Sequence, residues 1–242
     1  MQTVFSRHSL LGRHVLGELS PGFTGAASSW LKEHAKSRVE LVLSSLLCQA
    51  VALWSRESFS SFDMLEPALT VRLYHFCLHV IDSNQRFYAQ VDVMYESSQP
   101  TAAMLAGESN PANAPRPDLT IIMGRTKVRV EAKRLRLSES LPRKYVKEGM
   151  ARFRDERYGR PGDPGVMVGY VLSGDISRIV QKINDVISSE WVHGDEEHLG
   201  PSTVLGVNLQ LHKSAHPPSL KLLHHIIDLR SISVRAPQPG ER

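Results

Sequence analysis

Residues 117–133 read PDLTIIMGRTKVRVEAK, and this stretch decides the fold of the chain. It contains two apolar segments separated by a turn at Gly124, which is the pattern of a β-hairpin. In the second segment apolar and charged residues alternate, and this period of two places Glu131 and Lys133 together on the face opposite the core. Asp118 begins the neighbouring strand. We therefore expect two carboxylates and one lysine to converge on a solvent-facing side of a sheet.

That arrangement has a chemical use. Carboxylate oxygens bind hard cations such as Mg²⁺, which keeps several waters and takes only one or two carboxylates. The metal polarises a phosphoryl oxygen and lowers the pKa of a bound water. A nearby lysine orients the attacking water or offsets charge that develops on the phosphate. The pattern thus indicates a phosphodiester-cleavage site in which Lys133→Ala abolishes cleavage and leaves the fold intact.

These residues resemble the motif of the PD-(D/E)xK nuclease superfamily, which has the restriction-endonuclease-like fold. The match is Pro117-Asp118, a gap of twelve residues, and then Glu131-Ala132-Lys133. The resemblance implies that Asp118 and Glu131 bind Mg²⁺ or Mn²⁺ together with the backbone carbonyl of Ala132, and that Lys133 is the catalytic lysine. The alternative is a surface hairpin with an exposed glutamate and lysine.

The order of elements expected from the sequence is helix, strand, strand, strand, helix, strand, which is the core order of that fold. The expected ranges are residues 63–81, 87–95, 118–123, 127–134, 142–158 and 166–172. We expect an α/β protein with a mixed central sheet flanked by helices. Residues 1–62 form an N-terminal helical extension, and residues 63–242 form the nuclease-like domain.

Downstream elements are also indicated by the sequence. Asp175 is expected to cap a helix that runs to about residue 191. Two strands are expected over residues 203–212 and 220–229, separated by a turn at Pro217-Pro218. Residues 96–116 form a long loop, a type of segment that is often functional.

The superfamily also places an acidic residue on the helix before the first strand, and Glu66 is our candidate. Its alternative role is a capping box with Asp63 as the N-cap, and Glu40 on the earlier helix is the competing carboxylate. Glu148 and Arg152, spaced four apart on the helix after the motif, are candidates for contacting phosphate or supporting the lysine. The alternative for Glu148 and Arg152 is an ordinary surface pair on one helix face, and Tyr145 and Tyr158 have weaker claims to a role at the site. Arg134, Lys144, Lys147 and Arg152 are the candidate nucleic-acid-binding residues.

The chain is mildly basic, with a formal net charge of +4 and a sequence pI of about 9.1. The positive charge is concentrated in residues 125–160, around the motif, where a phosphate-binding surface is the functional interpretation. Solvated helix and strand faces are the alternative for any single one of these residues.

Other features restrict the function classes. Cys48 and Cys77 are the only cysteines and indicate a reduced compartment rather than a disulfide framework. We expect no signal peptide, and the apolar residues 39–54 are read as the core helix of a soluble cytoplasmic protein. There is no phosphate-binding GxxxxGK[ST] loop. His75 and His79 have helical metal-ligand spacing but lack a glutamate between them, and His224 and His225 point to opposite faces of a strand.

The leading hypothesis is a metal-dependent nuclease that acts on DNA in bacterial restriction or anti-phage defence. This hypothesis is compatible with a partner protein from a defence system or with a homo-oligomer. We expect no contact with a membrane. Residues 145–171 support the defence setting through a fainter resemblance to uncharacterised bacterial members of the superfamily. The second hypothesis is a non-catalytic nucleic-acid-binding or assembly subunit with the same fold. The third is a structural protein with a coincidental motif, in which Asp118, Glu131 and Lys133 would lie far apart.

Overall fold

The fold is taken from a computed structural model of the 242-residue chain. The structure describes residues 29–57, 64–98, 102–106, 108, 110, 112, 114–138, 140–158, 164–192 and 194–231, with side chains in the first range from residue 37. The chain divides into two compact units, Met1–Val39 and Glu40–Arg242. The central sheet and the candidate site lie in the second unit.

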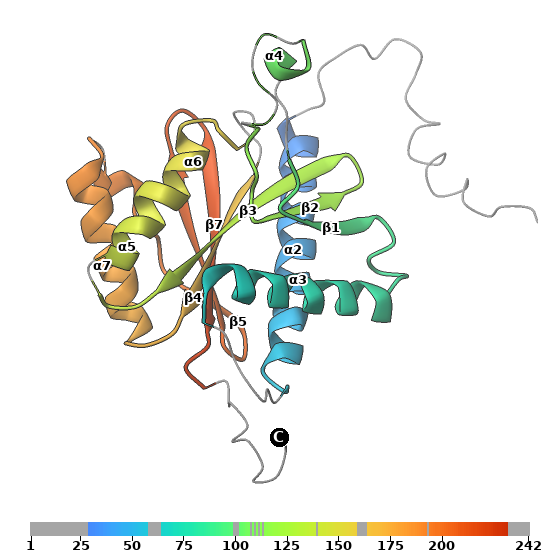
Figure 1. Ribbon diagram of the computed structural model, residues 1–242, viewed down its shortest axis with the longest axis horizontal. Coiled ribbons are helices and arrows are strands. Elements are labelled where there is room, and N and C mark those ends of the chain that lie inside the picture. The colour runs from blue at the N-terminus through green and yellow to red at the C-terminus, as the bar shows by residue number, and fades with distance from the viewer. Residues whose placement is uncertain are drawn as a thin grey trace, which may run out of the picture. The chain divides into compact units, whose positions relative to one another are not determined.

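A seven-stranded mixed sheet forms the centre of this unit, with strand order β1-β2-β3-β4-β7-β6-β5 (Figure 1). The first three strands pair antiparallel, β3 pairs parallel with β4, and β4 pairs parallel with β7. The last two pairs are antiparallel again. The strands are β1 (Val91–Tyr95), β2 (Leu119–Met123), β3 (Thr126–Leu135), β4 (Gly165–Val171), β5 (Thr203–Gly206), β6 (Leu209–His216) and β7 (Leu220–Asp228). The expected α/β class with a mixed sheet is confirmed.

The hairpin expected from residues 117–133 is present. Strands β2 and β3 pair in the register that opposes Leu119 to Val130 and Met123 to Thr126. The turn requires a positive φ of 58° at Gly124, a conformation that glycine adopts without a steric cost. Because β3 lies in the interior of the sheet, its hydrogen bonds to both neighbours fix the direction in which its charged side chains point.

Two helices contact the sheet face that carries Tyr170 and His225. They are α2 (Ser29–Trp54) and α3 (Glu66–Ser83). The Ser44 hydroxyl lies 3.3 Å from His225 Nε2, the Trp54 ring packs edge-on against Tyr170, and Tyr170 hydrogen-bonds Thr70 of α3. The two helices also contact each other, since Trp54 stacks on Phe76.

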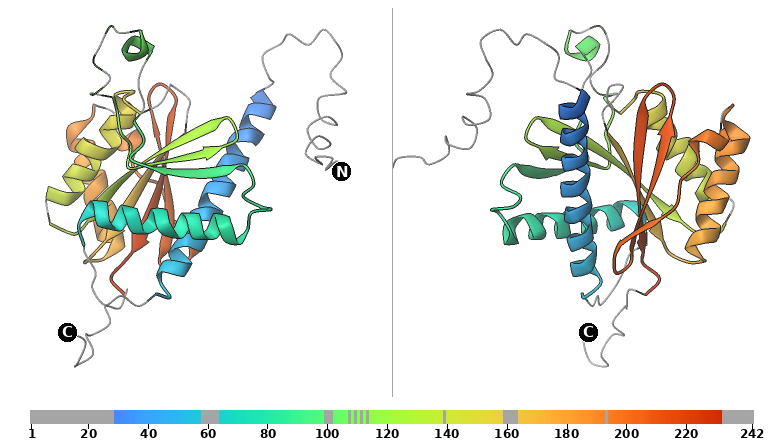
Figure 2. Two further views of the ribbon diagram at one scale, coloured as in Figure 1. Left: turned by 45° about the vertical axis from the view of Figure 1, so that its right-hand side comes forward. Right: turned by 180° about the vertical axis from the view of Figure 1, so that it is seen from behind.

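The opposite face of the sheet is covered by one continuous helical segment and by α7 (Ile176–Glu190), as Figure 2 also shows. The segment consists of α5 (Ser140–Lys144), a π-helical stretch η2 (Tyr145–Met150) and α6 (Ala151–Arg154). A Cβ on Gly149 would lie 2.5 Å from the terminal methyl of Met167 and 3.5 Å from Cγ of Lys133. This close approach buries the sheet face that carries Glu131 and Lys133, so the expectation that this face is solvated was wrong.

Several element boundaries differ from those expected. The strand expected from residue 87 begins at Val91, because residues 84–90 form turns in which Phe87 N–H donates to the Asn84 carbonyl. The strand expected over residues 203–212 is a hairpin of β5 and β6, whose turn contains Asn208 at a φ of 62°. The helix expected over residues 142–158 contains the π-helical stretch, and the long loop holds the short helix α4 (Ala102–Leu105).

Two expected caps have different outcomes. Asp175 caps α7 by accepting the Arg178 N–H, as expected. Helix α3 begins at Glu66, with Leu65 as the N-cap and no side-chain cap, while Asp63 lies outside the described residues. The Glu66 carboxylate is therefore available for other contacts.

Within the part of the chain that the structure describes, one helical stretch is long and apolar enough to cross a membrane, residues 37–54 of α2. Its side chains Leu43, Leu46, Ala50 and Trp54 are buried in the core. One side of this stretch therefore packs into the core, as the sequence led us to expect.

Candidate functional site

The site is built around β3, which supplies Glu131 and Lys133 from alternate positions on one face of the strand. Continued by one step, the β2–β3 register places Asp118 opposite Glu131. Asp118 Oδ2 accepts a hydrogen bond of 2.6 Å from the backbone N–H of Ala132. This bond ties the start of β2 to the middle of β3 and holds the third motif residue beside the other two. The third hypothesis predicted that these side chains would lie apart, and the structure brings them together.

Glu131 is fully buried, and its two carboxylate oxygens have different surroundings. Oε1 accepts from Lys133 Nζ at 2.7 Å and from Arg152 Nη1 at 2.7 Å. Oε2 is also buried and has no hydrogen-bond partner among the described residues. A buried carboxylate oxygen without a partner costs free energy, and such groups are found where a water, an ion or a catalytic role accounts for them.

Lys133 is the hub of the cluster, with 7% of its surface exposed. Its ammonium donates to Glu66 Oε1 at 2.8 Å, to Glu131 Oε1 at 2.7 Å and to the Ala132 carbonyl at 2.9 Å. Burial alone would lower the pKa of Lys133, but the ion pairs with the two carboxylates outweigh burial and raise this pKa above its usual value. Lys133 is therefore a fixed positive charge at neutral pH.

Glu66, rather than Glu40, is the helix carboxylate beside the motif. It lies at the first residue of α3, and its second oxygen accepts the backbone N–H of Arg134 at 3.2 Å. Glu40 lies on α2 and forms an ion pair with Lys213 of β6. Both carboxylates were candidates from the sequence, and only the tertiary contacts show which of them lies beside the motif.

The acidity of Asp118 is strongly perturbed by its surroundings. Burial and then the negative charge of Glu131 raise the pKa of Asp118 to about 7, although the Ala132 N–H and Lys133 act in the opposite direction. A carboxyl group poised near neutral pH by burial and a like charge is typical of functional sites, although structural ion-pair networks produce the same effect.

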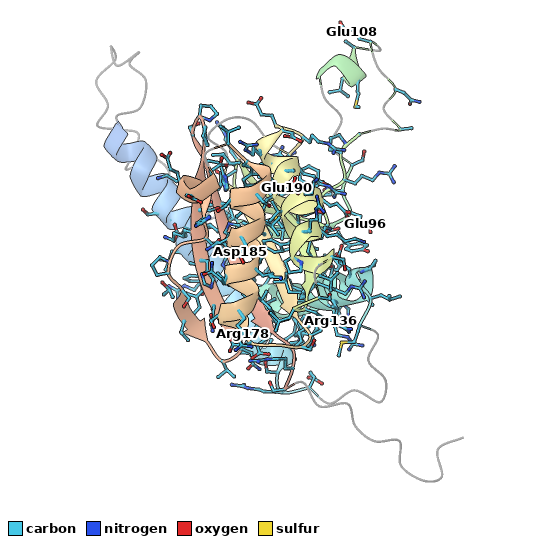
Figure 3. All side chains as sticks on the ribbon, turned by 90° about the vertical axis from the view of Figure 1, so that its left-hand side faces the viewer. Glu96, Glu108, Arg136, Arg178, Asp185 and Glu190 are labelled. Carbon is cyan, nitrogen blue, oxygen red and sulfur yellow. The ribbon has the colours of Figure 1, made fainter. Side chains whose placement is uncertain are left out.

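The four candidate nucleic-acid-binding residues occupy different environments. Lys144 and Lys147 are exposed, and Lys147 forms an ion pair with Glu190, which Figure 3 labels at the end of α7. Arg134 is half-buried and donates to the Met64 carbonyl at 3.4 Å. Arg152 contacts Glu131 and the Tyr158 hydroxyl at 2.7 and 2.8 Å. Arg152 is thus part of the acidic cluster rather than of an exposed basic surface.

Glu148 and Arg152 do not form the ordinary surface pair that was the alternative to a role at the site. The spacing of four residues predicts a shared helix face only for an α-helix, and Glu148 lies within the π-helical stretch Tyr145–Met150 whereas Arg152 lies in α6 after it. Glu148 is exposed, whereas Arg152 turns toward Glu131. A local interruption of this kind carries no clear signal in the sequence.

A second buried polar group lies on the same sheet face and was not anticipated. Tyr145 Oη lies 2.9 Å from His224 Nδ1, and the Ser214 hydroxyl lies 2.7 Å from both His224 Nε2 and His216 Nε2. His216 Nδ1 in turn lies 2.6 Å from Glu197 Oε2. Because an ionised carboxylate only accepts, the bonds form one directed chain from Tyr145 to Glu197.

The chain of hydrogen bonds contains the serine, histidine and carboxylate connectivity of a hydrolytic triad, but it has no access for a substrate. Ser214 is 6% exposed and Glu197 is 1% exposed. The hydrogen-bond chain ends at the buried Tyr145 of η2 on one side and at the Glu197 carboxylate on the other, and this carboxylate also accepts from Arg154 of α6 at 3.3 Å. The hydrogen-bond chain therefore fastens the helical segment to β6 and β7. The spacing of Ser214 and His216 on one strand was the only sequence signal for it.

No cluster of three or more histidine, cysteine, aspartate or glutamate side chains in metal-binding geometry occurs among the residues described. His75 and His79 are exposed on α3, and His224 and His225 point to opposite sides of β7, as expected for neighbours on a strand. In the acidic cluster, the Lys133 ammonium lies between Glu66 and Glu131, and Arg152 is paired with Glu131.

No family model or curated protein matches the sequence, and no solved structure matches the fold. The function is therefore inferred from the geometry of the cluster and from the motif.

Proposed function

We propose that the protein is a metal-dependent nuclease that hydrolyses phosphodiester bonds of DNA, with a restriction-endonuclease-like core. The observation that carries the proposal is the convergence of Glu66, Asp118, Glu131 and Lys133 on one site with a buried, unpartnered Glu131 oxygen. The helix α3, the strands β1 to β3, the helical segment and β4 follow in the order expected for that core.

The residues present fit a divalent cation. An unpartnered buried carboxylate oxygen is a ready ligand for a hard cation, and Asp118 supplies a second carboxylate whose ionisation is costly without a countercharge. Asp118, Glu131 and the Ala132 carbonyl would hold Mg²⁺ or Mn²⁺, with Glu66 in support. Such an ion supplies Lewis-acid activation of a phosphate and of a bound water.

The protein's own groups would complete the chemistry. Lys133, held by three oxygens, keeps a positive charge at the place where negative charge would develop on the phosphate. The exposed Lys144 and Lys147 would contribute to holding the DNA backbone, and Arg134 would do so from the edge of the site. A cytoplasmic role in bacterial restriction or anti-phage defence, with a partner protein or a second copy of the chain, belongs to the same proposal.

The test is a cleavage assay on single-stranded and duplex DNA with Mg²⁺, Mn²⁺ or a chelator. We expect cleavage only with a divalent ion, and its loss in Asp118→Asn and Glu131→Gln. Asp185→Asn, at an exposed carboxylate that Figure 3 labels on α7, serves as the matched control and should cleave like the wild type. Equal cleavage by folded Glu131→Gln and wild type would contradict the proposal.

A second candidate is a non-catalytic DNA-binding or assembly subunit. One observation favours it, namely that Glu131 already has two positively charged partners on a single oxygen. A wild type that binds DNA yet cleaves none of the substrates with any ion would support this function.

A further inference from the structure

Arg152 is the partly exposed partner of the buried Glu131. Its Nη1 atom lies 2.7 Å from Glu131 Oε1 and 2.8 Å from the Tyr158 hydroxyl. That hydroxyl donates to the Arg116 carbonyl at 3.0 Å. The side chain of Arg152 is 32% exposed, whereas that of Glu131 is fully buried. The arginine therefore separates the buried carboxylate from solvent and is anchored on its other side by Tyr158.

Arg152 and Lys133 crowd onto one oxygen of Glu131 while the other oxygen is unpartnered. A bidentate arginine–carboxylate pair would use both oxygens and would be the stronger arrangement. The observed geometry neutralises the charge of Glu131 without using its full capacity to accept hydrogen bonds. A carboxylate in this state retains a lone-pair site for another cation.

The charges of the cluster show what such a cation would require. When ionised, Glu66, Asp118 and Glu131 carry three negative charges, and Lys133 together with a divalent ion carries three positive charges. If Arg152 stayed in place, the cluster would hold one uncompensated positive charge in a largely buried environment, which is costly. If the guanidinium moved toward solvent, the cluster would be balanced. Arginine cannot lose its charge at neutral pH, so it must move rather than deprotonate.

We propose that Arg152 is a resident counterion of Glu131 that competes with a divalent cation for the site and is displaced from Glu131 when the cation binds. This inference rests on the proposed function, because it concerns the same metal site. Arg152 is a positioning residue in this scheme, since it acts through Glu131. It stabilises the metal-free protein and lowers the affinity of the site for the cation.

The experiment is a calorimetric titration of the full chain with Mn²⁺, performed on wild type, Arg152→Gln, Asp118→Asn and Arg143→Gln. Arg143 is an exposed arginine of the same helical segment, paired with Glu190, and its substitution removes the same charge outside the site. We expect Arg152→Gln to bind Mn²⁺ about ten-fold more tightly, within the usual range of coupling between sites. Arg143→Gln should bind like the wild type, and Asp118→Asn should lose most of the affinity. In the presence of a chelator, Arg152→Gln should melt at a lower temperature than the wild type, whereas Arg143→Gln should melt at the same temperature as the wild type.

The outcomes separate this inference from the proposed function. Mn²⁺ binding that depends on Asp118 but is equal or weaker in Arg152→Gln overturns the counterion role and leaves the metal site standing. No Asp118-dependent binding in any variant overturns both. If Arg152→Gln fails to fold, Tyr158→Phe decides, because it removes only the hydroxyl that anchors the guanidinium. Unchanged Mn²⁺ affinity in Tyr158→Phe then overturns the inference, and a several-fold gain supports it.

Discussion

The ammonium of Lys133 and the carboxylate of Glu66 lie 2.8 Å apart, although 67 positions separate them in the sequence. This contact joins the first turn of α3 to the C-terminal part of β3. Because the same ammonium lies 2.7 Å from Glu131, Lys133 forms ion pairs with two carboxylates at once. The lysine is thus both a candidate catalytic group and a structural group of the buried cluster.

Lys133→Met should therefore reduce stability as well as activity. Removing one partner of a buried ion pair typically costs about 3–5 kcal/mol, and we expect about 3 kcal/mol here because Arg152 still neutralises Glu131. Urea denaturation at pH 7 measures this change, with Lys144→Met at an exposed site as a control that stays within about 0.5 kcal/mol of the wild type. A Lys133→Met variant as stable as the wild type would show that the ion pairs contribute little.

Asp118→Asn should change how stability depends on pH. The pKa of Asp118 is about 7 in the folded protein and about 3.9 in an unfolded chain. Between these values the folded state keeps a proton that the unfolded state has lost, so the contribution of this group to stability falls as pH rises from about 4 to about 7. In a chelator at pH 8, we expect Asp118→Asn to be more stable than the wild type by on the order of 1 kcal/mol.

The comparison of the two proteins at pH 5 provides the control for Asp118→Asn. At pH 5 only about a third of the pH-dependent loss of stability has taken place in the wild type, so the advantage of the amide should be about one third of that at pH 8. An advantage of equal size at pH 5 and pH 8 would show that it does not arise from ionisation. With Mn²⁺ present, the wild type should instead gain affinity for the ion as pH rises to about 7, because the ion requires the ionised form.

The buried histidines should make the protein sensitive to acid. Burial lowers the pKa of His212, His216, His224 and His225, and that of His225 falls to about 3. Because the unfolded chain takes up these protons first, stability is retained above about pH 6.5 and is lost as pH falls toward 3. Each histidine contributes a slope of up to about 1.4 kcal/mol per pH unit. Thermal melts between pH 8 and pH 4 test this expectation.

A matched substitution identifies the source of that acid sensitivity. His225→Gln removes one buried imidazole and should make the decline of stability below pH 6.5 less steep. His75→Gln changes a histidine that is exposed on α3 and should leave the slope unchanged. Equal slopes for His225→Gln and the wild type would contradict the assignment.

Tyr145→Phe should weaken the attachment of the helical segment to the sheet. The substitution leaves His224 Nδ1 without its donor in a fully buried position, at a cost of about 1–3 kcal/mol. Denaturation experiments should show this loss, whereas Tyr74→Phe, at a half-buried ring on α3, should be close to neutral. If Tyr145→Phe were also neutral, the chain of hydrogen bonds would not be a fastening of the helical segment.

The sequence predicted those parts of the site that depend on local pattern. The alternation in residues 126–135 and the glycine at 124 were sufficient for the hairpin, for the shared face of Glu131 and Lys133 and for the position of Asp118. The burial of that face was missed, because it depends on Gly149 allowing the helical segment that follows β3 to pack closely against Lys133.

Contacts between distant segments account for the other omissions. The choice of Glu66 over Glu40 depends on where α3 begins relative to β3, and the pairing of Arg152 with Glu131 depends on the helical segment. The hydrogen-bond chain from Tyr145 to Glu197 joins four separate elements. None of these arrangements has a periodic signature along the sequence.

The π-helical stretch Tyr145–Met150 has a consequence for the length of the chain at this point. A π-turn accommodates one more residue than an α-turn over the same path, and each residue of an α-helix is rotated by about 100° from the one before it. Deleting a single residue within this stretch would therefore allow an ordinary α-helix to follow the same path, and α6 would keep its direction relative to α5. Arg152 and Arg154 would then still point toward Glu131 and Glu197. Adding a residue would instead rotate α6 by about 100° and turn both arginines away from their carboxylates, so the helical segment tolerates the loss of one residue here and does not tolerate the gain of one.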